Sequence, residues 1–411
     1  MTFRPYNAKL DKAASRRIWR EIGWIDYDDK DDEKYLHTFL ASSDVMVAEI
    51  DGHAECLVAA ENGSIRHLEK DLPLNIIAAV TTSHIARKQG FASHLTAQLI
   101  AAAAEKGAAV SALGMFEQGF YSRLGFGTGP YEHTVSFEPA RIKSRVRARV
   151  PLRIGIKDYK DCHNALMNRW RGHGSVQVFP AKSFKAEMGW TEQGFGLGYR
   201  DSNGCLSHFF WGSTKGEHGP YKITAIAYQN RDQLLELMAL IKGLGDQVYT
   251  VEMNEPAFVQ LQDMIASPFR GQARSENSEH EEYNSAEAYW QIRINDVLEC
   301  IAQTCLANRS TLSFNLTLTD PIDQYLDKSQ AWQGVAGQYT VHLGPNSEAK
   351  RGVQQGLPTL TASVGAFSRL WLGAASANSI ATADELTASQ QLLDQLDVTL
   401  ALPLPKVGWD F

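Results

Sequence analysis

The stretch LNIIAAVTTSHIARKQGFASHLTAQLIAAAAEKG, residues 74–107, decides the fold class. Residues 74–82 are mostly apolar or β-branched, which predicts a buried strand. The run from Gly90 to Lys106 is rich in alanine and stops at Gly107, which is typical of a helix with a glycine at its end. A buried strand followed closely by a helix predicts α/β alternation around a central mixed sheet.

The connection between this strand and this helix has the sequence Arg87-Lys88-Gln89-Gly90-Phe91-Ala92. The N-terminus of a helix offers unpaired N–H groups and the positive end of the helix dipole, so it can bind a pyrophosphate. Gly90 lets the backbone approach the phosphates, and the small Ala92 keeps the first helical turn clear. An ordinary strand-to-helix connection is the alternative interpretation.

The same loose pattern, Arg or Gln followed by x-x-Gly-x-Gly or Ala, occurs twice more, at residues 169–174 and 193–198. The first of these follows an expected helix, and the second lies within an expected strand, so neither opens a helix. Only residues 87–92 therefore have the context that phosphate binding requires.

Further elements are expected on both sides of this core. Before it we expect helices at 13–22 and 31–41 and a hairpin over 45–61 that turns at Asp51-Gly52. After it we expect strands at 108–113, 195–200, 205–212, 247–253, 311–319, 336–343 and 359–364, and helices at 158–170, 231–242, 366–373 and 383–396. A second unit begins near residue 149, the polar run 267–287 predicts a loop or linker, and no repeat of fixed period is present.

Size and composition exclude several classes of protein. A chain of 411 residues exceeds the size at which one core keeps growing, so we expect two or three domains. The net charge of −7 argues against nucleic-acid binding, and no segment is apolar enough to predict export or membrane insertion, so a cytoplasmic protein is expected. Five scattered cysteines and twelve histidines show no metal-ligand spacing, so no metal is expected.

The segment GFYSRLGFGTGPYEHTV, residues 119–135, makes a family resemblance definite. A phosphate-binding turn, a later strand and then Tyr-x-x-x-Gly-Phe resemble the GCN5-related N-acetyltransferases (GNAT). The three-part length, a second unit that lacks the turn, and a phenylalanine at the last position resemble the Eis (enhanced intracellular survival) family. The resemblance implies an α/β (α+β) fold with two tandem GNAT-like mixed-sheet domains, 1–147 and 148–286, followed by a domain like sterol carrier proteins, 287–411.

This resemblance implies acetyl-CoA as cosubstrate. It assigns cofactor contacts to the backbone of one strand end and of the turn, namely Val80, Thr81 and Thr82, and Arg87, Lys88, Gln89, Gly90, Phe91 and Ala92. A bulge in that strand would separate it from its neighbour, so that the pantetheine arm could hydrogen-bond like an additional strand.

The resemblance also implies two catalytic groups. Tyr121 falls on the tyrosine that protonates the departing thiolate, although from its spacing alone it could be a packed aromatic residue. The carboxylate of the last residue, Phe411, falls on the base for the acceptor amine, whose proton must be removed before it attacks the thioester. The final stretch LPLPKVGWDF, 402–411, by itself predicts only a docked terminus.

For the acceptor we expect a small cationic amine, aminoglycoside-like or polyamine-like. The acidic run DYDDKDDE, 26–33, could attract a cation, with Asp26 and Trp24 as candidate contacts, or its acids could simply favour the first turn of the next helix. Phe116 replaces the small polar residue expected near the acceptor channel, and Asp410 is either a source of negative potential or a solvated side chain.

Two alternatives to this function remain open. A protein lysine or peptide N-acetyltransferase would use the same chemistry on another acceptor. A binding protein that has lost catalysis would use its third domain for an apolar ligand, with residues 366–372 as a lipid pocket rather than as core. The resemblance further implies a homo-oligomer, a hexamer of the family type.

Overall fold

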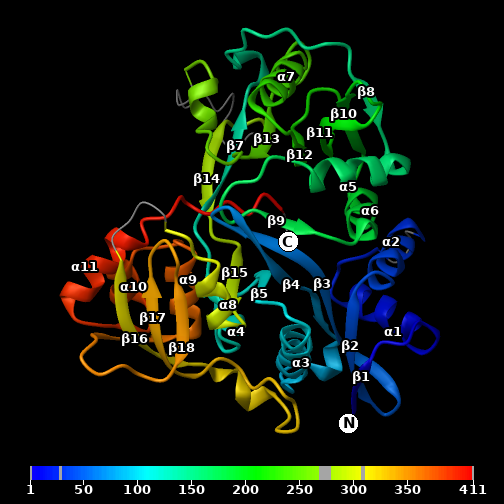
Figure 1. The fold of residues 1–411 in the computed structure, drawn as a ribbon. Helices are drawn as coiled ribbons and strands as arrows, with labels where there is room; N and C mark the ends of the chain where they lie inside the picture. Colours follow the sequence, from blue (N-terminus) through cyan, green and yellow to red (C-terminus); the bar gives the residue numbers. More distant parts are fainter. Residues whose placement is uncertain (1, 27–29, 268–278, 307–310, 410–411) are drawn as a thin grey trace.

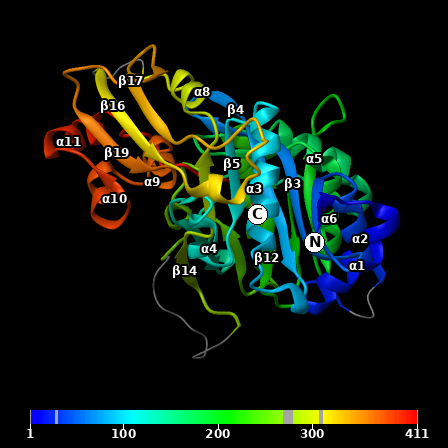
Figure 2. The same cartoon turned by 90° about the horizontal axis from the view of Figure 1, so that it is seen from below.

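The computed structural model describes residues 2–26, 30–267, 279–306 and 311–409, which form three β-sheets with helices packed on them (Figure 1). The fold is mixed α/β, as predicted. In both views the unit built around the third sheet lies on the opposite side of the molecule from α1 (Ala8–Glu21) and α2 (Lys30–Leu40) (Figures 1 and 2).

The first sheet has the order β1-β2-β3-β4-β5-β15-β6, with β9 added to β3. Its strands are β1 (Thr2–Pro5), β2 (Asp44–Ile50), β3 (His53–His67), β4 (Lys70–Thr82), β5 (Val110–Gly114), β6 (Gly127–Thr128), β9 (Val176–Val178) and β15 (Trp290–Ile294). β4 and β5 are parallel, and the crossover between them contains α3 (Phe91–Glu105), as the alanine-rich run predicted. The predicted hairpin between β2 and β3 is confirmed.

Side chains of β3 alternate between the two faces of this sheet. Cys56, Val58 and Ala60 pack in one core with α3, whereas Leu57 and Ala59 pack in another core with α1 and α2. Because successive side chains of a strand point to opposite faces, Glu61 follows Leu57 and Ala59 on the α1 and α2 face. This alternation places a carboxyl group among apolar neighbours.

The second sheet has the order β14-β7-β13-β12-β11-β10-β8. Its strands are β7 (Glu132–Phe137), β8 (Leu152–Ile154), β10 (Gly194–Arg200), β11 (Leu206–Ser213), β12 (Tyr221–Ala227), β13 (Val251–Asn254) and β14 (Tyr283–Glu287), and its helices are α5 (Tyr159–Met167), α6 (Ala181–Trp190) and α7 (Arg231–Lys242). As in the first sheet, antiparallel strands lead to a parallel pair, β12 and β13, with α7 in the crossover. The first and second sheets thus share a strand arrangement, although the amino-acid sequence contains no repeat of fixed period.

The first two sheets exchange a strand. β6 and β7 are neighbours in sequence but lie in different sheets, and so do β14 and β15. β15 pairs with β5, while β7 pairs with β13. β9 also pairs with β3, so strands pair across both predicted domain limits, 147/148 and 286/287. These domain limits stay a prediction.

The prediction of a loop over 267–287 is wrong at its end, because residues 283–287 form β14. All five residues of β14 are exposed, so no apolar alternation marks it in the sequence. Its backbone is nevertheless fixed by antiparallel pairing with β7.

The third sheet has the order β18-β17-β16-β19-β20. Its strands are β16 (Leu312–Thr319), β17 (Gly337–Leu343), β18 (Glu348–Arg351), β19 (Thr359–Ser363) and β20 (Leu386–Thr387), with α8 (Val297–Ala302), α9 (Val364–Trp371), α10 (Ala377–Ala383) and α11 (Gln390–Thr399). The single helix predicted at 383–396 is wrong, because α10 ends at Ala383 and Ser389 caps a new helix. Trp371 and Phe367 of α9 lie in the core, and the likeness to sterol carriers stays a prediction.

Candidate active site

The predicted phosphate-binding turn has the local geometry of a bent connection into a helix. Lys88 and Gly90 have positive φ values of 61° and 81°, and Gly90 is the N-cap of α3. Residues 87–90 are exposed, so their backbone is accessible to a ligand. The side chain of Phe91 is 2% exposed and packs in the core, which leaves its backbone N–H as the group that can face a phosphate.

Strand β4 contains the bulge that the sequence interpretation required. Its register with β3 shifts between Leu57 and Ala59, and Ala79 on β4 has a φ of 51°. The parallel pairing of β4 with β5 ends at Ile77 and Leu113. Beyond that point the two strands separate, and Val80 lies in the opening.

The two threonines after the bulge direct their side chains into the protein. Thr81 is 2% exposed and its hydroxyl donates to the carbonyl of Leu57 at 3.4 Å. The hydroxyl of Thr82 lies 3.2 Å from the thiol of Cys56. Contacts of these residues with a ligand would therefore come from the backbone, and these contacts stay a prediction.

A cavity of about 690 Å³ lies where β4 and β5 separate, between the first and second sheets. From the first sheet and its helices it is lined by Trp19, Trp24, Phe39, Glu61, Ile76, Ile77, Ala78, Ala79, Val80, Gly114, Met115, Phe116 and Tyr121. Most of the remaining wall comes from α6 and the second sheet with its connections: Thr134, Glu187, Trp190, Lys222, Ile223, Thr224, Glu252, Met253, Asn254, Glu287 and Tyr289. Trp409 completes the wall, so the last described residue of the chain contacts the same space as Tyr121.

Tyr121 lies on the short helix α4 (Gln118–Ser122) and is 2% exposed. Its ring is surrounded by Phe116, Phe120 and Phe126, with centroid distances of 5.7, 4.9 and 6.2 Å. Burial raises the pKa of Tyr121, so the phenol stays protonated at neutral pH. Among the described residues its hydroxyl has no hydrogen-bond partner, which leaves its proton available to a ligand.

The C-terminal segment is docked up to the last residue described. The carbonyl of Val407 accepts from the N–H of Val176 at 2.9 Å, and the N–H of Val407 donates to Glu132 at 3.2 Å. Lys406 forms an ion pair with the buried Glu132.

Two side chains then hold the next two peptide groups. Arg169 donates to the carbonyl of Gly408 at 3.2 Å, and the Tyr289 hydroxyl donates to the carbonyl of Trp409 at 3.0 Å. The predicted groups Asp410 and Phe411 lie outside the described residues, but the chain is fixed at the cavity immediately before them.

The predicted acceptor residues differ in position. Trp24 and Phe116 line the cavity and are 51% and 72% exposed, which places them at its open side. Asp26 is exposed, and its N–H donates to Asp32 at 3.2 Å. Among the described residues that line the cavity, Asp26 is not included.

Several wall residues were not singled out from the sequence. Glu61, Trp19, Phe39 and Trp190 come from β3, α1, α2 and α6, and no local motif unites them. Only Glu61 carried a signal, because a charged residue at an inward position of the apolar strand VAAEN is unusual.

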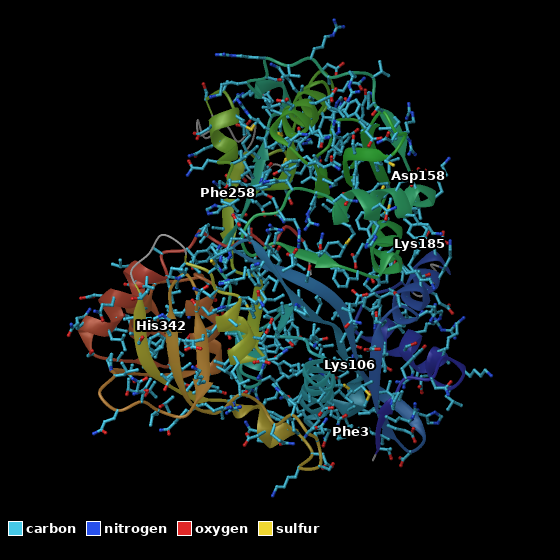
Figure 3. All side chains as sticks on the ribbon, viewed as in Figure 1. Phe3, Lys106, Asp158, Lys185, Phe258 and His342 are labelled. Carbon is cyan, nitrogen blue, oxygen red and sulfur yellow. The ribbon has the colours of Figure 1, made fainter. Side chains whose placement is uncertain are left out.

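The region where β12 and β13 separate is partly filled by the chain itself, which leaves a cavity of about 190 Å³ lined by Trp170, Tyr228 and Met253 among others. The N–H of Trp170 donates to the carbonyl of Tyr228, just beyond the end of β12, at 2.7 Å. Phe258, labelled in Figure 3, packs edge-on against Trp170 with a centroid distance of 5.0 Å. Helix α7 begins at an asparagine cap, Asn230, where the first unit has its glycine turn. Among the described residues, the start of α7 therefore has no counterpart of the glycine turn of the first unit.

No group of three or more His, Cys, Asp or Glu side chains in the described part of the chain is arranged to hold a metal ion. No helix within the same residues is long and apolar enough to cross a membrane.

Residues 17–129 match the family model of an acetyltransferase (GNAT) domain. The chain thus contains a GNAT acetyltransferase domain, a type that uses acetyl-CoA, and its activity is N-acetyl transfer of the GNAT type. The predicted class of enzyme is confirmed at this level.

Three solved structures are similar to the whole chain. A GCN5-related N-acetyltransferase from Kribbella flavida is 17% identical with a TM-score of 0.73, covering 100% of this chain and 98% of that one. A GCN5-related N-acetyltransferase from Anabaena variabilis is 13% identical and Eis1 from Mycobacterium abscessus is 12% identical, each with a TM-score of 0.76 and full coverage of both chains. At these identities the likeness is one of fold. No curated protein matches the chain in sequence.

Proposed function

We propose that this protein is an Eis-type N-acetyltransferase that acetylates a small cationic amine, aminoglycoside-like or polyamine-like. One observation carries the proposal: a single cavity adjoins the bulge of β4, the buried Tyr121 and the docked C-terminal segment. These are the positions at which a thioester, an acid and a base would have to meet for direct transfer.

The proposed chemistry needs no covalent enzyme intermediate. The acceptor amine is mostly protonated at neutral pH and must lose a proton before it attacks the thioester carbonyl. The carboxylate of Phe411 is proposed to take that proton, directly or through water. Tyr121 then protonates the thiolate of CoA as the carbon–sulfur bond breaks, so that proton and charge balance across the step.

The acidic and aromatic character of the cavity supports a cationic acceptor. The described residues that line it include the glutamates Glu61, Glu187, Glu252 and Glu287 and one lysine, Lys222. Lys222 lies 3.5 Å from Glu252 and is therefore offset locally. A cavity with this balance attracts ammonium groups and disfavours anions.

A mixed panel of acceptors scored by CoA release tests the proposal. We expect turnover with polyamines or aminoglycosides and much slower turnover with lysine peptides and protein N-termini. Preference for peptides would favour the protein acetyltransferase instead. Binding of acetyl-CoA by calorimetry without turnover of any amine would favour a binding protein and contradict the enzyme.

Adding a short C-terminal tag tests the base. The tag moves the terminal carboxylate without changing any residue of the chain, so we expect the rate of transfer to fall about 10²-fold or more while acetyl-CoA still binds. A tagged enzyme with full activity would make Phe411 an anchor only.

A cytoplasmic homo-oligomer, with a hexamer as the expected assembly, is part of the same proposal. Light scattering coupled to size exclusion measures the mass in solution, and a monomeric mass of 45.6 kDa would contradict it.

A further inference from the structure

We propose that Glu61 and four rings that line the same cavity, those of Trp19, Trp24, Phe39 and Trp190, form a subsite for a second protonated amine of the acceptor. The inference rests on the proposed function, because it specifies the substrate class of that site: a linear amine with a second cationic group.

Glu61 is a buried carboxylate without a cationic partner. It is 6% exposed and lines the cavity, and its Oε1 accepts hydrogen bonds from Ser43 at 3.2 Å and from Ser183 of α6. Among the described residues no Lys, Arg or His forms an ion pair with it. Glu55 on the same strand provides the contrast, because it is 5% exposed but is held by Arg17 at 2.7 Å.

An uncompensated buried carboxylate is costly, and either protonation or a neighbouring cation relieves that cost. Burial raises the pKa of Glu61 to about 7, so the group is partly protonated at neutral pH in the free protein. A cation placed beside it would favour the ionised form and supply the missing partner. Glu61 thus lacks a cationic partner among the described residues, and an ammonium group of a ligand would supply one.

The four rings supply a surface of the same electrostatic preference. Trp19 lies 5.1 Å from Trp24, 5.6 Å from Trp190 and 6.5 Å from Phe39, and Phe39 lies 6.1 Å from Trp190. All four line the cavity with Glu61. The faces of aromatic rings attract cations, so the rings and the carboxylate select one kind of ligand, an alkylammonium group.

The register of the sheet separates this subsite from the transfer site. Glu61 pairs with Ile76, and Val80 lies four residues farther along β4, a separation of at most roughly 13 Å because the bulge at Ala79 shortens the strand. An acceptor that uses both sites must therefore carry its two amines on a chain of several carbons. This excludes short diamines as preferred substrates.

Kinetics with matched acceptors test the subsite. A linear alkane diamine is compared with the alkylamine of the same length in the wild type, in Glu61→Gln and in Glu55→Gln, which loses an equally buried carboxylate outside this cavity. We expect Glu61→Gln to raise KM about tenfold for the diamine and not for the alkylamine, with kcat kept within about twofold, and Glu55→Gln to leave the ratio of the two KM values unchanged. Equal effects of Glu61→Gln on both amines would overturn the proposal.

Binding without chemistry provides a second arm. A bis(trimethylammonium) alkane has no N–H to acetylate, and calorimetry without acetyl-CoA should give about tenfold weaker binding to Glu61→Gln than to the wild type. Trp24→Leu, at a half-exposed position that can be changed without opening the core, should weaken binding in the same direction if Glu61→Gln folds poorly. Unchanged binding in a folded variant overturns the subsite.

The two arms separate this proposal from the proposed function. Binding that depends on Glu61, without acetylation of any amine, would reject the function and keep the subsite. Acetylation with identical KM values for the diamine in the wild type and Glu61→Gln would keep the function and reject the subsite.

Discussion

Burial controls the protonation of two side chains in the cavity, and both are shifted toward the neutral form. Tyr121 remains a phenol at neutral pH, which suits a proton donor, whereas Glu61 titrates near pH 7. The motif Tyr-x-x-x-Gly-Phe was enough to find Tyr121. Glu61 could not be assigned from the sequence, because its partners Ser43 and Ser183 are distant from it along the chain.

Removal of the Tyr121 hydroxyl tests its role as the acid. Tyr121→Phe keeps the ring that packs against Phe120 but removes the proton, so we expect kcat to fall about 10²–10⁴-fold with little change in KM. Steady-state kinetics measure this, with Tyr131→Phe at an exposed tyrosine as the control. A Tyr121→Phe enzyme within about twofold of wild-type kcat would assign the ring to packing alone.

At the scale of elements, the strand, turn and helix that we propose to bind the cofactor contain three residues with positive φ. Ala79, Lys88 and Gly90 all have positive φ, the first at the bulge and the others in the turn. Such conformations cost energy for residues other than glycine and persist where the surrounding structure fixes them. Their position between β4 and α3 agrees with a backbone shaped for a ligand.

The helix α3 provides a matched pair of glycines for a test of the turn. Gly90 at its start and Gly107 just after its end have φ values of 81° and 96°, and neither would bring an added Cβ into a close contact. Alanine at either position should cost about 1–2 kcal/mol of folding stability, but only Gly90→Ala should weaken acetyl-CoA binding, by roughly tenfold. Calorimetry measures the binding, and equal affinities of the two variants would remove the turn from the cofactor site.

The C-terminal segment is a second element whose position can be tested. Tyr289→Phe removes the hydrogen bond to the carbonyl of Trp409, so we expect kcat to fall about 3–10-fold in the native chain. In the chain with a C-terminal tag, where the base is already displaced, the same substitution should have no further effect. Equal effects in both backgrounds would show that Tyr289 acts on something other than the terminus.

Most elements of the first unit could be predicted because their signals are local. The alanine-rich helix, the Asp51-Gly52 turn and the apolar strand 74–82 each carry their own pattern. The strand 283–287 and the break between α10 and α11 could not be predicted, because an exposed edge strand has no apolar period and a single serine cap does not interrupt a helical pattern.

For the whole molecule, a cluster of buried polar rings joins the three units. His67 of β3 is stacked on Trp371 of α9 at 4.3 Å and lies 5.0 Å from His173 of the second unit. His173 accepts from the N–H of Leu68, and its other ring nitrogen lies 2.8 Å from the carbonyl of Leu372. His173 thus accepts at Nδ1, which fits its neutral form with the proton on Nε2.

This cluster predicts a loss of stability in acid. Burial lowers the pKa of His67 and His173 below the ordinary value of 6.5, so below that pH the unfolded chain binds protons that the folded chain does not. His67, whose pKa lies well below that value, should remove about 1.4 kcal/mol of stability between about pH 7.5 and about pH 5.5, and His173 acts in the same direction. Burial has the opposite effect on Glu61, whose raised pKa favours the folded state as pH falls toward its ordinary range.

A comparison of variants isolates the histidine contribution. Urea unfolding at both pH values should show that His67→Leu loses about 1.4 kcal/mol less than the wild type on acidification, whereas the exposed His53→Leu loses as much as the wild type. An identical loss in His67→Leu would mean that this ring is not titrated by unfolding.

The exchange of strands between the first and second sheets could not be predicted from the sequence. Pairing of β15 with β5 joins residues about 180 positions apart, and a local pattern contains no information on which sheet a strand will enter. The layout of three units could be inferred from family resemblance, but the exchange of strands could not.

That exchange limits how this protein can be divided. A gene fragment ending at residue 147 would encode β7 without the sheet that it completes and would leave β5 without β15, with its backbone groups open to other chains. Recombination that transferred such a fragment would transfer neither a closed core nor a working enzyme. The smallest fragment that contains the complete first sheet therefore extends at least through Ile294, the end of β15. Any transfer of this acetyltransferase domain, by recombination or by engineering, must include the second unit as well.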